Sequence, residues 1–132
     1  MARFLVVLDV DSTLIENEVI ELLAEEAGSL DEVAAITARA MNGLMDFEQS
    51  LRSRVATLAG LPASVFDTVG ARVRVTSGVE RMIAVIQSAG GRVGVVSGGF
   101  HEVVDPIAER LGLNYWRANR LEVVDGHLTG SL

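Results

Sequence analysis

The chain has 132 residues, a formal net charge of −7 and no cysteine, and 49% of its residues are hydrophobic. This length allows one modest core, and this composition is too apolar for a disordered chain. The lack of cysteine excludes disulfides and thiolate metal sites, and the acidic balance argues against nucleic acid as the main partner. No apolar run reaches the ~18 residues that cross a bilayer, and carboxylates interrupt the N-terminal apolar run, unlike in a signal peptide. We therefore expect a cytoplasmic protein without a membrane partner.

The first predicted element is a short buried strand over Phe4–Leu8, because five apolar residues are too few for a helix. Asp9 and Asp11 follow this strand directly. Open α/β sheets bind ligands at the carboxyl ends of their strands, and two carboxylates placed there repel each other. The pair therefore indicates a cation site, or a nucleophile beside a proton carrier. An equally open alternative is structural, with one aspartate capping a helix and the other in a turn.

Four short amphipathic helices are predicted between residues 15 and 75, where apolar residues recur at helical spacing. The runs are separated by breaks that contain glycine at positions 28, 43 and 60. Asp31 and Asp46 are predicted to be the N-caps of the second and third helices. Because these helices are inserted directly after the aspartate pair, we expect them to form a cap over the strand end.

From residue 76 onward, helix and strand signals alternate, which predicts a parallel sheet with helices packed on it. A helix is expected between Gly78 and Gly90, and a further helix before residue 112. Strands are expected over 92–96 and 114–118, with a turn over 97–99 between the first of them and the second helix. Asp125-Gly126 is a strong signal for a type I′ hairpin that joins two short strands.

The run from Asp9 through Asp11 and Ser12-Thr13 after an apolar strand is more specific than two aspartates alone. Asp9 can attack phosphorus as a nucleophile and form an acyl-phosphate. Asp11 can protonate the leaving oxygen and later activate water. We expect a hard cation, Mg²⁺, to offset the negative charge of the carboxylates and of a bound phosphate.

Ser97-Gly98-Gly99 is the second candidate for phosphate chemistry, because it follows an apolar strand and precedes a helix. Backbone N–H groups at a helix N-terminus bind anions, and glycines let the backbone approach the ligand. The Ser97 hydroxyl adds a donor. Taken alone, this stretch is more often an ordinary strand-to-helix turn with Ser97 as its cap.

Glu18 and Arg54 are charged residues on predicted helices, where most such residues are solvated. A functional interpretation is recognition of a zwitterion, with Arg54 binding a carboxylate through its fork and Glu18 meeting an ammonium group. Met41 and Phe47 are expected in the core of the helical cap, with a pocket wall as the alternative.

The remaining residues of note receive structural interpretations. Trp116 is expected in the core. His101 and His127 are expected at the surface, because neither has ligand spacing to another histidine.

Five stretches together resemble the phosphoserine phosphatase family of the haloacid dehalogenase (HAD) superfamily: DVDSTL at 9–14, Glu18, residues 35–55, VVSGGF at 95–100 and residues 118–130. The resemblance runs from residue 3 to residue 130, with the motifs in the right order. It implies an α/β fold with a Rossmann-like HAD core over 1–14 and 76–132, in which the parallel sheet is incomplete. It further implies an inserted four-helix-bundle cap over 15–75 and a C-terminal β-hairpin.

The resemblance implies Mg²⁺-dependent hydrolysis of O-phospho-L-serine to L-serine and phosphate, the last step of serine biosynthesis, through an aspartyl-phosphate. In this family, the position of Asp9 holds the nucleophile and that of Asp11 the general acid/base. The metal ligands would be Asp9 and the backbone carbonyl of Asp11. The residues implied to bind the substrate are Ser97 and Gly98 for the phosphate, Glu18 and Arg54 for the amino and carboxylate groups, and Met41, Phe47 and Gly99 around them.

One departure from the family pattern is serious. The family has a lysine that holds the phosphate and the nucleophile, and a GDGxND motif that completes the Mg²⁺ site. This sequence contains no lysine and no such motif. We therefore expect weak or no activity from this chain alone, and two alternatives stay open: a related HAD phosphatase for another small phosphomonoester, or a non-catalytic truncated fragment.

The same departure bears on folding, because the missing strand lies beside the first strand in the family's sheet. The strand over 4–8 would then be an apolar sheet edge with unpaired N–H and C=O groups. We expect such an edge to produce a homo-oligomer or a marginally folded chain.

Overall fold

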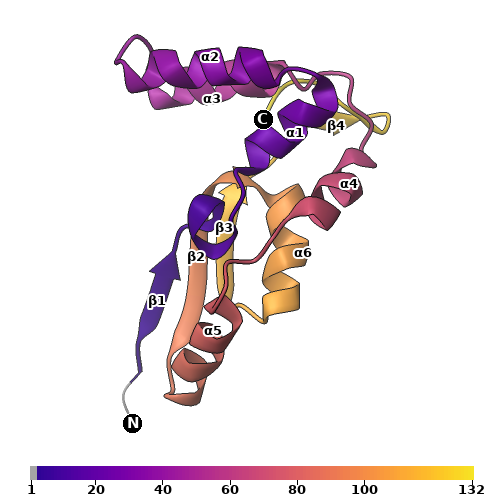
Figure 1. Ribbon diagram of the computed structural model, residues 1–132. Helices are drawn as coiled ribbons and strands as arrows, with labels where there is room; N and C mark the ends of the chain where they lie inside the picture. The colour runs from indigo at the N-terminus through magenta and orange to yellow at the C-terminus, as the bar shows by residue number, and fades with distance from the viewer. Residues whose placement is uncertain (1–2) are drawn as a thin grey trace.

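The computed structural model describes residues 3–132, and the predicted α/β class is confirmed (Figure 1). Within this range, none of the helices combines the length and the apolar character that a membrane crossing requires. The elements are, in chain order, β1 (Leu5–Leu8), an irregular turn η1 (Val10–Leu14), α1 (Val19–Ala27), α2 (Leu30–Met41), α3 (Phe47–Ala56), α4 (Val65–Arg72), α5 (Val79–Ser88), β2 (Arg92–Phe100), α6 (His101–Leu111), β3 (Tyr115–Asn119), β4 (Val123–Val124) and β5 (His127–Leu128).

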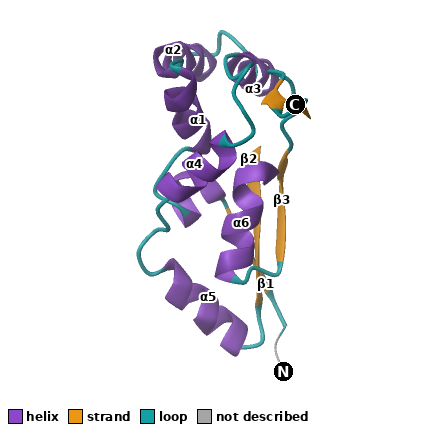
Figure 2. Ribbon diagram, turned by 90° about the vertical axis from the view of Figure 1, so that its right-hand side faces the viewer, coloured by secondary structure: helices purple, strands orange, loops and turns teal. Residues whose placement is uncertain are grey.

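The predicted parallel sheet is present and has the strand order β1-β2-β3. Helices α5 and α6 contact one face of this sheet, as Figure 2 shows. Within residues 3–132 no helix lies on the other face. On this face and at the β1 edge, Leu5 and Val7 are both 54% exposed, and Val96 is also exposed. Parallel sheets are usually covered on both faces, so this apolar surface is unusual.

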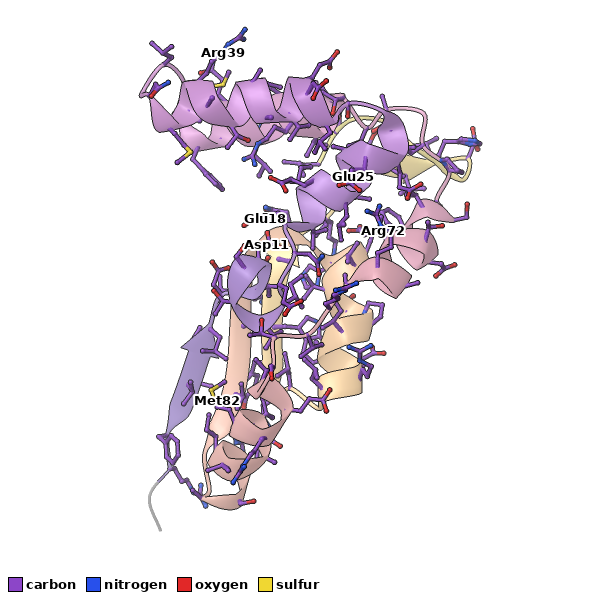
Figure 3. All side chains as sticks on the ribbon, viewed as in Figure 1. Asp11, Glu18, Glu25, Arg39, Arg72 and Met82 are labelled. Atoms are coloured by element: carbon purple, nitrogen blue, oxygen red, sulfur yellow. The ribbon has the colours of Figure 1, made fainter. Side chains whose placement is uncertain are left out.

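The four predicted helices between residues 15 and 75 are present as α1 to α4. Helices α2 and α3 lie side by side beyond the carboxyl ends of the strands, and α1 leads up to them (Figure 1). Helix α4 packs against both α1 and α6. Arg72 of α4 forms ion pairs with Glu25 and Glu26 of α1 and so ties these two helices together (Figure 3).

Two predicted helix caps have different outcomes. Asp46 is confirmed as the N-cap of α3, because its Oδ1 accepts the N–H of Gln49 at 2.7 Å. The prediction of Asp31 as the N-cap of α2 is wrong, because this helix already begins at Leu30 and its N-cap position is Ser29. The left-handed Gly28, which ends α1 with φ +72°, turns the chain so sharply that α2 starts directly after Ser29.

The two chain crossings between the sheet and helices α1–α4 lie side by side. Ile15 and Val75 form an antiparallel bridge. The N–H of Thr76 donates to the carbonyl of Leu14 at 3.0 Å, and Glu16 N–H donates to the Arg74 carbonyl at 2.8 Å. The bridge coincides with the predicted boundaries at residues 15 and 75. The division into a core and a cap itself stays a prediction.

The predicted hairpin is present between β4 and β5, with Asp125 and Gly126 both at positive φ, as a type I′ turn requires. It pairs with the connection between α3 and α4. Leu128 N–H donates to the Leu61 carbonyl, and Gly60 N–H donates to the Leu128 carbonyl, both at 2.8 Å. The hairpin therefore connects β3 to the helical part of the molecule.

The turn predicted over 97–99 is wrong, because β2 continues in extended conformation to Phe100. Its pairing with β3 is nevertheless interrupted. Val96 lies opposite Arg117 and Phe100 lies opposite Asn119, so three residues of β2 face the single residue Ala118 of β3. The bulge lies at the carboxyl end of the sheet, and buried Phe100 anchors its far side in the core.

The surface position predicted for His101 is also wrong, since its exposed fraction is only 8%. Its Nε2 accepts the N–H of Ala118 at 3.1 Å, and its Nδ1 lies 2.7 Å from Asp105 Oδ1. Trp116 is partly buried and donates its Nε1–H to the same Asp105 oxygen at 2.7 Å. The bulge in β2 explains this arrangement, because the histidine ring takes the Ala118 N–H at the interrupted part of the ladder.

Candidate active site

The aspartate pair and the Ser97-Gly98-Gly99 stretch meet at one edge of the sheet, because β1 and β2 are parallel neighbours. A pocket of about 250 Å³ lies there, between the strand ends and helices α1 and α3. Its lining residues are Asp9, Asp11, Glu18, Ile20, Phe47, Leu51, Arg54, Gly98, Gly99 and Phe100.

The chain reverses direction immediately after β1. Asp9 Oδ1 accepts the N–H of Val10 at 2.8 Å, and Ile15 N–H donates to the Val10 carbonyl at 3.1 Å. Ser12 takes a left-handed conformation with φ +56°, which is uncommon outside glycine, and its N–H donates to the Asn17 carbonyl at 3.1 Å. This tight turn keeps both carboxylates at the end of β1.

The carboxyl group of Asp11 both binds the start of α1 and lines the pocket. Its Oδ1 accepts the N–H of Val19, the first residue of α1, at 3.2 Å. Its Oδ2 lies on the side of β2, since a Cβ atom added to Gly99 would be 3.8 Å from it. Burial raises the pKa of Asp11 to about 6, with smaller contributions from Glu18 and Asp9. A carboxyl group whose pKa lies this close to neutrality can both give and take a proton, which suits a general acid/base.

This raised pKa predicts how stability depends on pH. Below pH ~4 the carboxyl of Asp11 is protonated in both the folded and the unfolded chain, and above pH ~6 it is ionised in both. In between, only the folded chain keeps the proton, so stability falls as pH rises. Relative to Asp11→Asn, the unmodified chain should lose up to about 3 kcal/mol of unfolding free energy from pH 4 to pH 7. Urea unfolding in EDTA measures this difference.

The matched control for that experiment is Glu109→Gln, which neutralises an exposed carboxylate near the end of α6. Its stability should follow that of the unmodified chain at every pH. A difference between the unmodified chain and Asp11→Asn that stays constant from pH 4 to pH 7 would contradict the raised pKa.

Gly98 and Gly99 line the β2 side of the pocket, whereas Ser97 is buried and is not among the lining residues. Gly99 N–H donates to Ser97 Oγ at 2.8 Å, which leaves the hydroxyl proton of Ser97 for another acceptor. A Cβ atom on Gly99 would lie 3.0 Å from Ser97 Oγ, tighter than ordinary contact. Because Gly99 has no side chain, the space between Ser97 Oγ and Asp11 Oδ2 is not filled.

Glu18 and Arg54 bring opposite charges to the same pocket. Glu18 Oε1 accepts the hydroxyl of Ser12 at 2.7 Å, and Figure 3 shows Glu18 next to Asp11. Partial burial lowers the pKa of Arg54, while Glu18 and Asp11 raise it, and arginine remains protonated in proteins. Its Nε donates to the Ser50 carbonyl at 3.3 Å. Among residues 3–132 no ion pair occupies the Arg54 guanidinium, so its terminal nitrogens can receive a carboxylate.

The predicted cap-core positions of Met41 and Phe47 are wrong, because these side chains are 83% and 67% exposed. They stand at the end of α2 and the start of α3, at the free end of this helix pair (Figure 1). Phe47 lines the pocket, and its Cζ would lie 3.4 Å from a Cβ atom on Gly98. Met41 is not among the lining residues, so the structure does not bring it to the pocket.

Three apolar lining residues were not predicted: Ile20, Leu51 and Phe100. Their sequence spacing matches that of core residues, so periodicity alone does not distinguish a pocket wall from the core.

The donor set of the pocket fits a hard divalent cation that is bound partly by the protein. Within residues 3–132 no group of three or more histidine, cysteine or acidic side chains forms a complete metal site. Asp9 and Asp11 supply carboxylate oxygens to the pocket. Magnesium is commonly bound by one or two carboxylates together with water and substrate phosphate, and the Asp9 carboxylate alone meets that requirement.

The structure combines a parallel α/β sheet with two carboxylates at the end of its first strand. The family model for haloacid dehalogenase-like hydrolases matches residues 6–132, and the chain belongs to this family. The HAD part of the resemblance stated from the motifs is thereby confirmed.

Several relatives that are similar to this chain are named phosphoserine phosphatase. The chain is 60% identical over 129 residues to the phosphoserine phosphatase of Streptomyces coelicolor and 55% identical over 128 residues to that of Streptococcus thermophilus. These matches cover 98% and 97% of this chain, but only 32% and 60% of the relatives. A structure of a substrate-bound phosphoserine phosphatase superimposes with a TM-score of 0.92 at 46% identity, covering 99% of this chain and 62% of that one.

Proposed function

We propose that this chain is the nucleophile-bearing part of a phosphoserine phosphatase. One observation carries the proposal: a single pocket collects two carboxylates at a strand end, a glycine-lined backbone segment and a pair of opposite charges. The first two features suit a phosphomonoester, and the third suits an amino acid. The names of the relatives support the same substrate.

In the proposed reaction, Asp9 attacks the phosphorus atom and the serine oxygen leaves, which gives an aspartyl-phosphate. Asp11 donates its proton to the leaving oxygen and then accepts a proton from the water that hydrolyses the intermediate. A carboxyl with a pKa of about 6 can do both near neutral pH. A related structure that is named as a phospho-aspartyl intermediate analogue of phosphoserine phosphatase supports this intermediate.

The phosphate is proposed to lie against the Ser97 hydroxyl and the amide of Gly98, with Gly99 beside them. Asp9 and the backbone carbonyl of Asp11 would hold Mg²⁺, which neutralises the charge that carboxylates and phosphate bring together. The protein contributes the placement of these groups: β1 and β2 are adjacent, so the nucleophile and the phosphate donors share one edge of the sheet.

The serine part of the substrate is proposed to lie between α1 and α3. Glu18 would accept the ammonium group, and Arg54 would bind the carboxylate with two parallel hydrogen bonds. Phe47 would cover the substrate from the free end of α3. Met41 could join it only after a movement of the α2–α3 end, because it lies outside the pocket.

A substrate panel tests this proposal. Phosphate release is measured with phosphoserine, phosphoethanolamine, which lacks the carboxylate, and phosphoglycolate, which lacks the ammonium group. Phosphoserine should be hydrolysed with the highest kcat/KM. Equal rates on all three would favour the alternative, a phosphatase for other small phosphomonoesters. Saturable phosphoserine binding without hydrolysis would favour a non-catalytic fragment.

A homo-oligomer is proposed to form through the open edge of β1. Within residues 3–132, β1 has a partner strand on one side only, and Leu5 and Val7 are half exposed there, so a second β1 strand could pair with it. Light scattering during size-exclusion chromatography would show a dimer, and a monodisperse monomer would contradict the proposal. The remaining proposals are a cytoplasmic location and the absence of nucleic-acid or membrane partners.

A further inference from the structure

The Gly98–Gly99 peptide unit is held from both sides by side chains. The carbonyl of Gly98 and the N–H of Gly99 belong to the same rigid plane. Asn119 Nδ2 donates to the Gly98 carbonyl at 3.1 Å, and Gly99 N–H donates to Ser97 Oγ at 2.8 Å. Two hydrogen bonds at opposite ends of one plane set its orientation.

In the part of the chain that the structure describes, the β2–β3 ladder does not set this orientation. The pairing of β2 with β3 is interrupted between Val96 and Phe100, so this peptide unit lies in the bulge. Glycine on both sides allows rotation of the plane at little steric cost. The side-chain bond from Asn119 therefore replaces a missing ladder hydrogen bond.

The end of β3 that carries Asn119 is held by contacts with buried residues. It is the last residue of β3 and lies opposite Phe100, which is fully buried. The preceding residue, Ala118, donates its N–H to buried His101, whose ring is held by Asp105. The end of β3 is thus fastened to α6 next to the bulge.

We propose that Asn119 is a positioning residue for the phosphate-binding segment. It directs the Gly98 carbonyl toward β3 and so keeps this oxygen away from the pocket. Without this bond the peptide plane can rotate and turn its carbonyl toward the anion, beside the carboxylate of Asp11. The inference rests on the proposed function, since it assumes that Ser97 and Gly98 bind phosphate.

The test uses Asn119→Ala and the isosteric Asn119→Asp, which also lacks the donor. Inorganic phosphate is titrated in the presence of Mg²⁺ while the ¹⁵N chemical shifts of Gly98 and Gly99 are recorded. Both variants should weaken phosphate binding by about fivefold, the size expected for one lost hydrogen bond. Exchange of the Gly99 amide hydrogen should become about tenfold faster, because the plane is no longer held.

Asn114→Ala is the matched control, because Asn114 stands just before the other end of β3. Its Oδ1 accepts the Val93 N–H at 2.8 Å, far along the strand from the bulge. This variant should lower the melting temperature without changing phosphate affinity or Gly99 exchange. An equal loss of phosphate affinity in Asn114→Ala would reduce the role of Asn119 to general stability and overturn the inference.

Two further outcomes separate the inference from the proposed function. If the unmodified chain shows no phosphate-dependent shift at Gly98, the proposed function fails, while the Gly99 exchange rates still decide whether Asn119 holds the peptide. If the unmodified chain binds phosphate and both Asn119 variants match it in affinity and exchange, the inference fails and the proposed function stands.

Discussion

Phosphate release from phosphoserine by this chain is expected to be weak, and replacement of Asp9 by Asn is expected to abolish it. An amide is a poor nucleophile toward phosphorus, so the aspartyl-phosphate cannot form. The substitution leaves the local fold in place, because an asparagine Oδ1 can still accept the Val10 N–H that Asp9 accepts at 2.8 Å. The measurements are phosphate release and mass spectrometry of the acid-quenched chain for a phosphoryl group on the peptide that contains residue 9.

Asp46→Asn is the control for that experiment. Asp46 is an exposed cap of α3, and asparagine caps helices about as well as aspartate, so both rate and stability should be kept. A phosphoryl group found elsewhere in the chain, or an undiminished rate in Asp9→Asn, would show that another residue is the nucleophile.

Replacement of Arg54 by Ala is expected to lower kcat/KM for phosphoserine by about 10- to 10²-fold. The loss should be several times smaller for phosphoethanolamine, which has no carboxylate for Arg54 to bind.

Glu18→Gln should show the complementary pattern, with a smaller loss for phosphoglycolate, which has no ammonium group. Steady-state kinetics with the three substrates measures both patterns.

Arg52→Ala is the matched control on the same helix. Arg52 is exposed and pairs with Glu48 at 3.1 Å, one turn earlier on α3, so its loss should leave all three rates unchanged. Equal losses on all three substrates in Arg54→Ala would contradict recognition of the carboxylate. Such a result would instead indicate a general effect of the arginine charge on the pocket.

Part of the active-site geometry could be predicted from short stretches of sequence. A run of apolar residues with an aspartate at its end identifies a strand end, and parallel strands place their ends at one edge. For that reason Asp9, Asp11, Gly98 and Gly99 were expected together, and they line one pocket. Arg54 lies far from them in sequence, and its placement depended on the resemblance rather than on its helical spacing.

The residues at the free end of the α2–α3 pair could not be placed in this way. Helical spacing indicates which face of α2 or α3 is apolar, but it does not show how far the helix pair extends beyond its neighbours. Met41 and Phe47 were therefore predicted as core residues, whereas both are exposed at the free end of the pair.

The sequence by itself determined the features that depend on neighbouring residues: the order of strands and helices, the Asp46 cap and the Asp125-Gly126 turn. These depend on local hydrogen bonds and on backbone conformations that only certain residues adopt readily. Tertiary structure alone decided the bulge in β2, the burial of His101 and the bond from Asn119. Each of these depends on a contact between β2, β3 and α6, and the local sequence does not show which backbone groups remain unpaired once two strands meet.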